Sequence, residues 1–293
     1  MASLYTHQSQ NIRKSWLLMT VFFMVVFIIG WILVAYTGNG AILWIAVAFS
    51  LLMNATSFWF SDTLAIKASR AQPADGTIYK DLHNMVENLA ITAGLPKPRV
   101  YIIDDPAPNA FATGRNPKNA AIAVTTGLLA TLEKVELEGV LAHELAHIGN
   151  RDILVMSIAV VLVGFVAIIT DLLWRISLFG GDRDRNVHPA LLITGIALII
   201  LGPVIARLMQ FAVSRKREFT ADATGALLTR YPEGLASALE KISSYGKPMK
   251  HASGATAHLF IGNPFGGSGG KMMRKLFSTH PPMEERVAKL RGV

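Results

Sequence analysis

Two long apolar runs, separated by a short turn, open the chain. Residues 16–36 and 41–60 contain no charged side chain, and each run is long enough as a helix to cross a hydrocarbon core of about 30 Å. The four residues between the runs include two glycines, which is typical of a tight turn. The first run exceeds the apolar core of a signal peptide, which is about 7–15 residues, and no A-x-A-like cleavage site follows it. The pattern predicts a retained transmembrane hairpin over residues 1–60.

Two shorter apolar runs lie later in the chain. Residues 153–170 and 189–206 are each 18 residues without a charge, close to the lower limit for a membrane-spanning helix. Pro203 predicts a kink in the second of these runs. Together they predict a second hairpin over residues 153–213, so that the chain crosses the membrane four times.

The stretch between the two hairpins, residues 61–152, has the pattern of a folded aqueous segment. Apolar residues at helical spacing predict a helix over 77–93, which Gly94 closes. The pattern then predicts a strand at 99–104, a turn at 105–109, a strand at 120–125 and a helix at 136–150.

The final stretch, residues 214–293, is also polar enough to lie in water. Helical spacing predicts a helix that ends near residue 229 and another over 232–245. Neither aqueous stretch alone holds all the candidate site residues described below. We therefore predict a mainly α membrane protein in which one α+β domain with a small sheet is assembled from 61–152 and 214–293.

A glycine-rich segment interrupts this final stretch. Residues 246–270 contain seven glycines and little periodicity, which predicts a mobile loop with His251 and His258 in solvent. A last short helix is expected after Pro282.

Composition and charge narrow the class of protein. Of the 293 residues 52% are hydrophobic and only 16% are charged, which is typical of a membrane protein. The net charge is +8, but the basic residues flank the apolar runs and form no stripe interleaved with aromatic residues, which argues against nucleic-acid binding. The chain has no cysteine, so disulfides are excluded and a metal site must use His, Asp or Glu.

The distribution of Lys and Arg predicts the orientation in the membrane. There are two before the first run, none in the turn at 37–40, nine in 61–152, three in 175–189 and thirteen after residue 213. Because basic residues are retained on the cytoplasmic side, both termini and both aqueous stretches are expected in the cytoplasm. The two aqueous stretches can share a site only if the second hairpin returns to the same side, which agrees with this orientation.

The candidate chemistry lies in the sequence His143-Glu144-Leu145-Ala146-His147. Residues four apart share one face of a helix, so both imidazoles can reach one divalent metal, for which zinc is the best candidate. Glu144 can then take a proton from a water that the metal activates. The alternative is a helix that carries polar residues on an exposed face.

A third ligand is expected from the helix near residue 218. Glu218 completes a two-His, one-Glu set, and Asp222, four residues later, can accept a hydrogen bond from the second ring nitrogen of a ligand histidine. Arg215, three residues before Glu218, can steady its carboxylate, although a solvated arginine is an equal alternative.

Four motifs in order carry a resemblance to a known family. PNAFATG at 108–114, HELAH at 143–147, REFTAD at 217–222 and STHPP at 278–282 resemble the HtpX family of bacterial membrane zinc endopeptidases, which is related to the CAAX prenyl endopeptidases. The resemblance covers essentially the whole chain.

The resemblance implies a gluzincin-like peptidase with one zinc ion per chain. It implies that Asn109, Ala110 and Phe111 lie on an edge strand that receives the substrate and that His280 stabilises the oxyanion. By spacing alone, residues 109–111 fit an ordinary hairpin with Phe111 in the core. The implied substrates are misfolded or damaged membrane proteins at a bacterial inner membrane, in quality control and the stress response.

Two other functions remain open at this point. One is a prenyl-protein-type peptidase acting on a lipidated C-terminus, although a large enclosed chamber needs more spans than four. The other is a non-catalytic membrane scaffold with a structural metal, which would need a fourth protein ligand and no Glu144. The sequence does not predict the oligomeric state.

Overall fold

The structure is a computed structural model that describes residues 4–162, 165, 215–254, 256–266 and 281–292. Most of the second predicted hairpin, including Pro203, lies outside these residues, and so does His280. The expectation of four membrane spans therefore stays a prediction.

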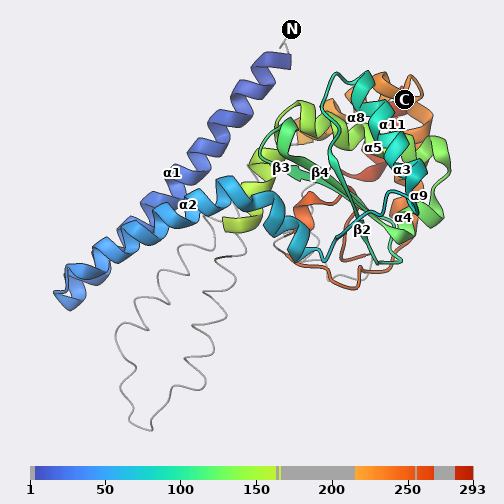
Figure 1. Cartoon of the computed structure of the whole chain (residues 1–293). Helices are drawn as coiled ribbons and strands as arrows, with labels where there is room; N and C mark the ends of the chain where they lie inside the picture. Colours follow the sequence, from blue (N-terminus) through green and yellow to red (C-terminus); the bar gives the residue numbers. More distant parts are fainter. Residues whose placement is uncertain (1–3, 163–164, 166–214, 255, 267–280, 293) are drawn as a thin grey trace.

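The first predicted hairpin forms two long helices, α1 (Leu4–Thr37) and α2 (Ala41–Ala68). The segments Ser9–Ala35 and Ala41–Ala68 are long and apolar enough to cross a membrane. Figure 1 shows the two helices, in blue, lying against one another and extending away from the domain that contains the strands. Many of their large apolar side chains are exposed, among them Trp16, Trp31, Trp44 and Trp59. These helices fit a lipid environment, as the sequence predicted.

A four-stranded mixed sheet forms the centre of the domain, in the order β1-β2-β4-β3. The central pair is parallel, and both outer strands are antiparallel to their neighbours. Every residue of β4 is buried, which explains its continuous apolar sequence because a strand covered on both faces does not alternate with polar residues. The four strands are β1 (Gln72–Pro73), β2 (Arg99–Ile103), β3 (Ala110–Gly114) and β4 (Ala120–Thr125).

Three helices cover one face of the sheet and form the main core with it. Ile122 and Val124 of β4 pack in the same cluster as Leu141 and Leu145 of α5. The three helices are α3 (Lys80–Thr92), α5 (Lys134–Gly149) and α9 (Pro232–Ser244). The remaining elements are η1 (Pro117–Asn119), α4 (Thr126–Thr131), α8 (Arg215–Thr229), η2 (Ala257–Leu259) and α11 (Met283–Arg291).

The other face of the sheet is covered by the end of α2 and by segments far from it in sequence. Phe111 and Ala123 of the sheet share a cluster with Ile66 of α2, Met156 and Phe260. The last turns of α2 therefore belong to the core of the domain, which explains why this helix continues beyond residue 60, where the apolar run ends.

The described part of the glycine-rich segment, residues 246–254 and 256–266, is packed, contrary to the expected mobile loop. It has little helix or strand, but Ala257, Leu259 and Phe260 are buried. The expectation that His258 is solvated is wrong, because its ring is fully buried and Nε2 lies 3.0 Å from the carbonyl oxygen of Met156. His251 is exposed as predicted. Glycine spacing predicts irregular backbone, but it does not reveal which apolar side chains anchor that backbone to the core.

Helices α5 and α9 cross at two glycines. A Cβ atom on Gly139 would lie 2.7 Å from the backbone nitrogen of Leu235, and one on Gly234 would lie 2.6 Å from the carbonyl oxygen of Val135. Real Cβ atoms do not approach backbone so closely, so larger residues here would force the helices apart.

We expect Gly139→Ala to destabilise the domain by about 1–3 kcal/mol, the usual cost of overpacking, despite the better helix propensity of alanine. The measurement is the apparent melting temperature of the full chain in detergent. Gly149→Ala on the same helix is the matched control, since its Cβ would lie 3.6 Å from Leu95, an ordinary contact. Equal melting temperatures for the two variants would contradict the close crossing.

Candidate active site

Helix α5 carries the two histidines and Glu144. A capping box starts this helix, in which Glu133 accepts a hydrogen bond from the backbone of Glu136 and the Glu136 side chain accepts one from the backbone of Glu133. His143, Glu144 and His147 are 1%, 2% and 3% exposed. The alternative of an exposed polar helix face is therefore wrong.

Helix α8 brings two carboxylates to the same place. Glu218, Asp222 and Gly225 lie on one face of α8 by their spacing, and all three are buried. A Cβ atom on Gly225 would lie 3.0 Å from the backbone nitrogen of His143, so glycine permits the close approach of α8 to α5. This approach places both acidic side chains within reach of the histidines.

His143, His147 and Glu218 form a group that can hold a metal ion. One ligand atom from each of them lies within 4.8 Å of the others. The Nε2 atoms of the two histidines are 3.1 Å apart. The Glu218 carboxylate lies 3.8 Å from Nε2 of His143 and 3.5 Å from Nε2 of His147. The predicted ligand set is thus brought together at one point.

The second nitrogen of each ring faces a carboxylate. Nδ1 of His143 lies 2.9 Å from Asp222, and Nδ1 of His147 lies 3.0 Å from Asp152. A neutral imidazole that donates from Nδ1 has only a lone pair on Nε2. Two lone pairs then face one another across 3.1 Å in a buried space, an arrangement that favours a cation between them.

The balance of charge also fits a divalent cation. Among the described residues around the two rings, four buried carboxylates face two buried guanidinium groups. With neutral histidines and four ionised carboxylates the site is short of two positive charges, which a divalent cation or protons on His147 and Glu144 would supply. Buried charges are costly unless they are compensated in one of these ways. The carboxylates are those of Glu144, Asp152, Glu218 and Asp222, and the guanidinium groups are those of Arg217 and Arg286.

The pKa values of the α5 side chains reflect this environment. Burial lowers the pKa of His143 to about 4. Burial also opposes charge on His147, but its hydrogen bond to Asp152 and the nearby Glu218 carboxylate outweigh it and raise the pKa of His147 to about 9. Burial raises the pKa of Glu144 to about 7, which suits a group that both accepts and donates a proton near neutral pH.

Arg286 of α11 connects the ligands of α8. Its guanidinium donates to both carboxylate oxygens of Asp222, at 2.9 and 2.6 Å, and lies 3.6 Å from Glu218. Burial would raise the pKa of Asp222, but the hydrogen bonds from His143 and Arg286 lower it to about 2. Asp222 is therefore held ionised, as the acceptor for His143.

Sequence reasoning missed Asp152 and Arg286. Asp152 follows His147 by five residues, and on a straight helix two residues at that spacing do not share a face. Arg286 reaches the site only because α11 packs on α8, which the sequence pattern does not predict. Arg215, for which steadying Glu218 and solvation were equal alternatives, is exposed, and Arg286 lies 3.6 Å from the Glu218 carboxylate.

The edge strand β3 runs beside Glu144. The backbone N–H of Ala112 faces the carboxylate of Glu144 closely enough to oppose the rise of its pKa. The side chains of residues 109–111 point elsewhere: Asn109 bonds the backbone of Gly262 at both ends of its amide, and Phe111 is fully buried against Phe260. Any contact of β3 with a substrate must therefore use its outward-facing backbone.

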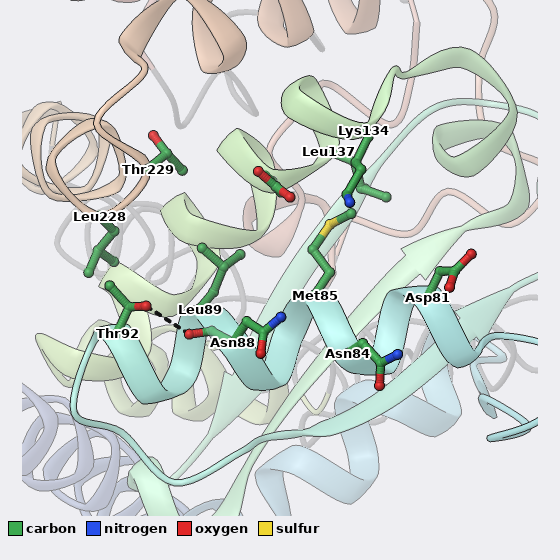
Figure 2. Close-up of a pocket in the computed structure, with 11 residues that line it drawn as sticks. Asp81, Asn84, Met85, Asn88, Leu89, Thr92, Lys134, Leu137, Leu228 and Thr229 are labelled. Carbon is green, nitrogen blue, oxygen red and sulfur yellow. Dashed lines mark hydrogen bonds between the residues drawn. The ribbon is translucent and has the colours of Figure 1, made fainter.

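A separate pocket lies between α3, the start of α5 and the end of α8 (Figure 2). Its volume is about 710 Å³, and none of its lining residues belongs to the group around the two histidines. The polar and charged residues that line it include Asp81, Asn84, Asn88, Lys134 and Glu138.

Comparisons of sequence agree on one family. The model of "Peptidase family M48" matches residues 79–293. A "Protease HtpX homolog" of Caldanaerobacter subterraneus subsp. tengcongensis is 44% identical over 299 residues, which cover 99% of this chain and 98% of that protein. The homolog of Thermoanaerobacter pseudethanolicus is 46% identical with the same coverage, and that of Burkholderia ambifaria is 46% identical over 84% of this chain and 85% of its own length.

A solved structure has a similar fold. The crystal structure of S. mikatae Ste24p matches 97% of this chain and 66% of its own chain, with a TM-score of 0.50 and 20% sequence identity. At this identity the likeness shows the fold alone.

We expect Asp152→Asn and Asp222→Asn each to weaken metal binding by about 10–100-fold, the usual effect of removing an acceptor behind a ligand histidine. Affinity is measured by competition with a chelator. Asp105→Asn is the matched control, because Asp105 is equally buried but bonds the backbone of Ala107 and Lys250, away from the histidines. If the control weakens binding as much as the other two, the acceptor roles of Asp152 and Asp222 are wrong.

Proposed function

The chain belongs to peptidase family M48 and is a membrane metallopeptidase, and on this premise we propose that it is a zinc endopeptidase that cleaves misfolded or damaged membrane proteins. We place this activity at the cytoplasmic face of a bacterial inner membrane, in protein quality control and the stress response. One observation carries the chemistry: two buried Nε2 atoms face one another beside Glu218, while carboxylates hold both Nδ1 atoms.

His143, His147 and Glu218 would hold one zinc ion. Zinc bound there would supply a Lewis acid for the scissile carbonyl and for an attacking water. A set of three protein ligands is the number that catalytic zinc sites use. A structural site in a scaffold would need a fourth protein ligand, and it would give Glu144 no role.

Glu144 is proposed to transfer the proton. Its carboxylate takes a proton from the attacking water and then delivers it to the amine that leaves when the peptide bond breaks. A pKa near 7 supports both halves of this transfer at neutral pH. His280, outside the described residues, is proposed to stabilise the oxyanion, as the STHPP resemblance implies.

The substrate is proposed to pair with β3 as an added strand. Asn109 accepts a backbone hydrogen bond from Thr125 of β4, whereas the carbonyl oxygen of Ala110 accepts one from Ile261 on the other side. Alternation along the strand then directs the backbone of Ala112 away from β4, beside Glu144. A peptide that pairs with Ala112 places its own backbone next to the proposed base.

We propose that the chain is divided into four segments. Residues 1–60 and 153–213 would form the transmembrane hairpins, and residues 61–152 and 214–293 the cytoplasmic catalytic domain. The charge distribution along the chain supports this orientation. The candidate metal ligands lie a few residues before and after the second predicted hairpin, so the site would be close to the membrane surface. That position suits substrates that are themselves membrane proteins.

We expect Glu144→Gln to retain metal but to lower peptide-bond hydrolysis by at least about 100-fold, because it removes the proposed base and spares the ligands. The assay is metal-dependent cleavage of an unfolded membrane protein by the purified full chain. Glu138→Gln, a half-buried glutamate on the same helix that lines the separate pocket, is the control and should remain active. Full activity of Glu144→Gln would show that another group is the base.

Single cysteines test the orientation, because the natural chain has none. A cysteine at Gly76 or Ser253 should be shielded from a membrane-impermeant thiol reagent added to spheroplasts, whereas one at Asn39 or Asn186 should be labelled. Labelling at Asn39 but not at Asn186 would mean that the second hairpin does not cross. Labelling at Gly76 or Ser253 would place the domain outside and overturn the cytoplasmic assignment.

A further inference from the structure

Asn11 is a buried polar residue near the start of the first membrane helix. It is 3% exposed, and its amide nitrogen donates to the carbonyl oxygen of Asn150 at 3.0 Å and to Oδ1 of Asp152 at 2.7 Å. Its amide oxygen accepts from the guanidinium of Arg217 at 3.2 Å. Both hydrogens and the oxygen of one side chain are therefore used in contacts about 140 and 206 positions away in sequence.

The residues that Asn11 contacts form the bend after the metal-binding helix. Helix α5 ends at Gly149, and the helix Asp152–Leu162 leaves it at 85°. Arg151, between the two helices, has a φ of 61°, which is unusual for a residue with a side chain. Asn11 bonds the residue on either side of Arg151 and so fixes the bend.

The bend is what brings Asp152 to His147. On a straight α-helix a residue five positions later points about 140° away, so Asp152 could not face the ring. In the bent chain Oδ2 of Asp152 lies 3.0 Å from Nδ1 of His147, while Oδ1 accepts from Asn11 and lies 3.5 Å from Arg217. One oxygen is held so that the other points at the histidine.

We propose that Asn11 is a positioning residue of the metal centre, through which docking of the first membrane helix orients His147. The proposal rests on the proposed function, since it takes His147 as a metal ligand. It predicts that the affinity for metal depends on a side chain of α1 that does not touch the metal ligands themselves.

If Asn11 served only to attach α1 to the domain, its hydrogen bonds to Asn150, Asp152 and Arg217 would not be needed. Neighbouring apolar residues of α1 already pack against the helix Asp152–Leu162, among them Leu18, Met19 and Phe22. A buried amide adds little to that contact unless all its hydrogen bonds are satisfied, because desolvation of a polar group is costly. The contacts of Asn11 are with the group that orients His147 rather than with the nearest backbone of its own helix.

The test compares metal binding in the full chain in detergent. Asn11→Asp keeps the size of the side chain but replaces the donor to Asp152 with a repelling carboxylate, and we expect binding of Co²⁺ and Zn²⁺ to weaken about tenfold. The Co²⁺ absorption spectrum at saturating metal should also change, which loss of a purely structural contact would not cause. Asn11→Ala, which adds no charge, gives the same comparison if Asn11→Asp does not fold.

Asn54→Ala is the matched control. The amide of Asn54 on α2 donates to the carbonyl oxygen of Met19 on α1 at 3.1 Å, so it also anchors α1 through a side-chain hydrogen bond, but to α2 rather than to the residues around the histidines. Its loss should leave the affinity within about twofold and the Co²⁺ spectrum unchanged. Equal losses in the two asparagine variants would reduce Asn11 to a contact between helices and overturn the proposal.

A double variant tests whether Asn11 acts through Asp152. In Asn11→Asp combined with Asp152→Asn, donor and acceptor are exchanged, so the pair can form again and binding should be tighter than the product of the single losses predicts. Strictly independent losses would sink the proposal. If the wild-type chain itself binds no metal, the proposed function fails, whereas normal binding by Asn11→Asp rejects the role of Asn11 alone.

Discussion

The concentration of buried carboxylates around two histidines constrains the rest of this structure. Ionised groups away from water are costly unless each finds opposite charge or hydrogen-bond donors. No single helix can supply these partners. Glu144 comes from α5, Glu218 and Asp222 from α8, and Arg286 from α11, so the charges are compensated only when the three helices pack together. A divalent cation would complete the compensation, and its binding would then be coupled to folding.

The same constraint explains how closely the helices approach α5. Short hydrogen bonds between side chains of different helices require short distances between their backbones. Glycine permits these short backbone distances at Gly225, where α8 meets His143 of α5, and at Gly139, where α9 crosses α5. In this way α5 is surrounded by the sheet and by other helices, and that burial in turn shifts the pKa values of its own His143 and Glu144.

Local patterns in the sequence predicted the parts of the site that share one helix. His143 with His147, and Glu218 with Asp222, are four residues apart, and helical periodicity alone places each pair on one face. The bend that turns Asp152 towards His147 and the packing of Arg286 on α8 depend on tertiary structure, which periodicity does not contain. The prediction that His258 is solvated failed for the same reason, because a glycine-rich sequence does not indicate that the ring is buried beside the carbonyl oxygen of Met156. The strands at 99–104 and 120–125 were predicted almost to the residue because their apolar runs are bounded by turn residues.

The geometry of the edge strand bears on the kind of substrate that the proposed function allows. At one end of β3 the backbone of Ile261 donates to Ala110, and at the other end the hydroxyl of Ser157 accepts from the backbone of Gly114. Ala112 lies between these two contacts, with its N–H facing Glu144. A peptide that pairs there must therefore enter a short section of edge in extended form. A folded protein holds its strands in its own sheets and cannot offer such a segment, whereas an unfolded chain can. If substrates pair with β3 as proposed, selection for unfolded polypeptides would follow from the edge itself.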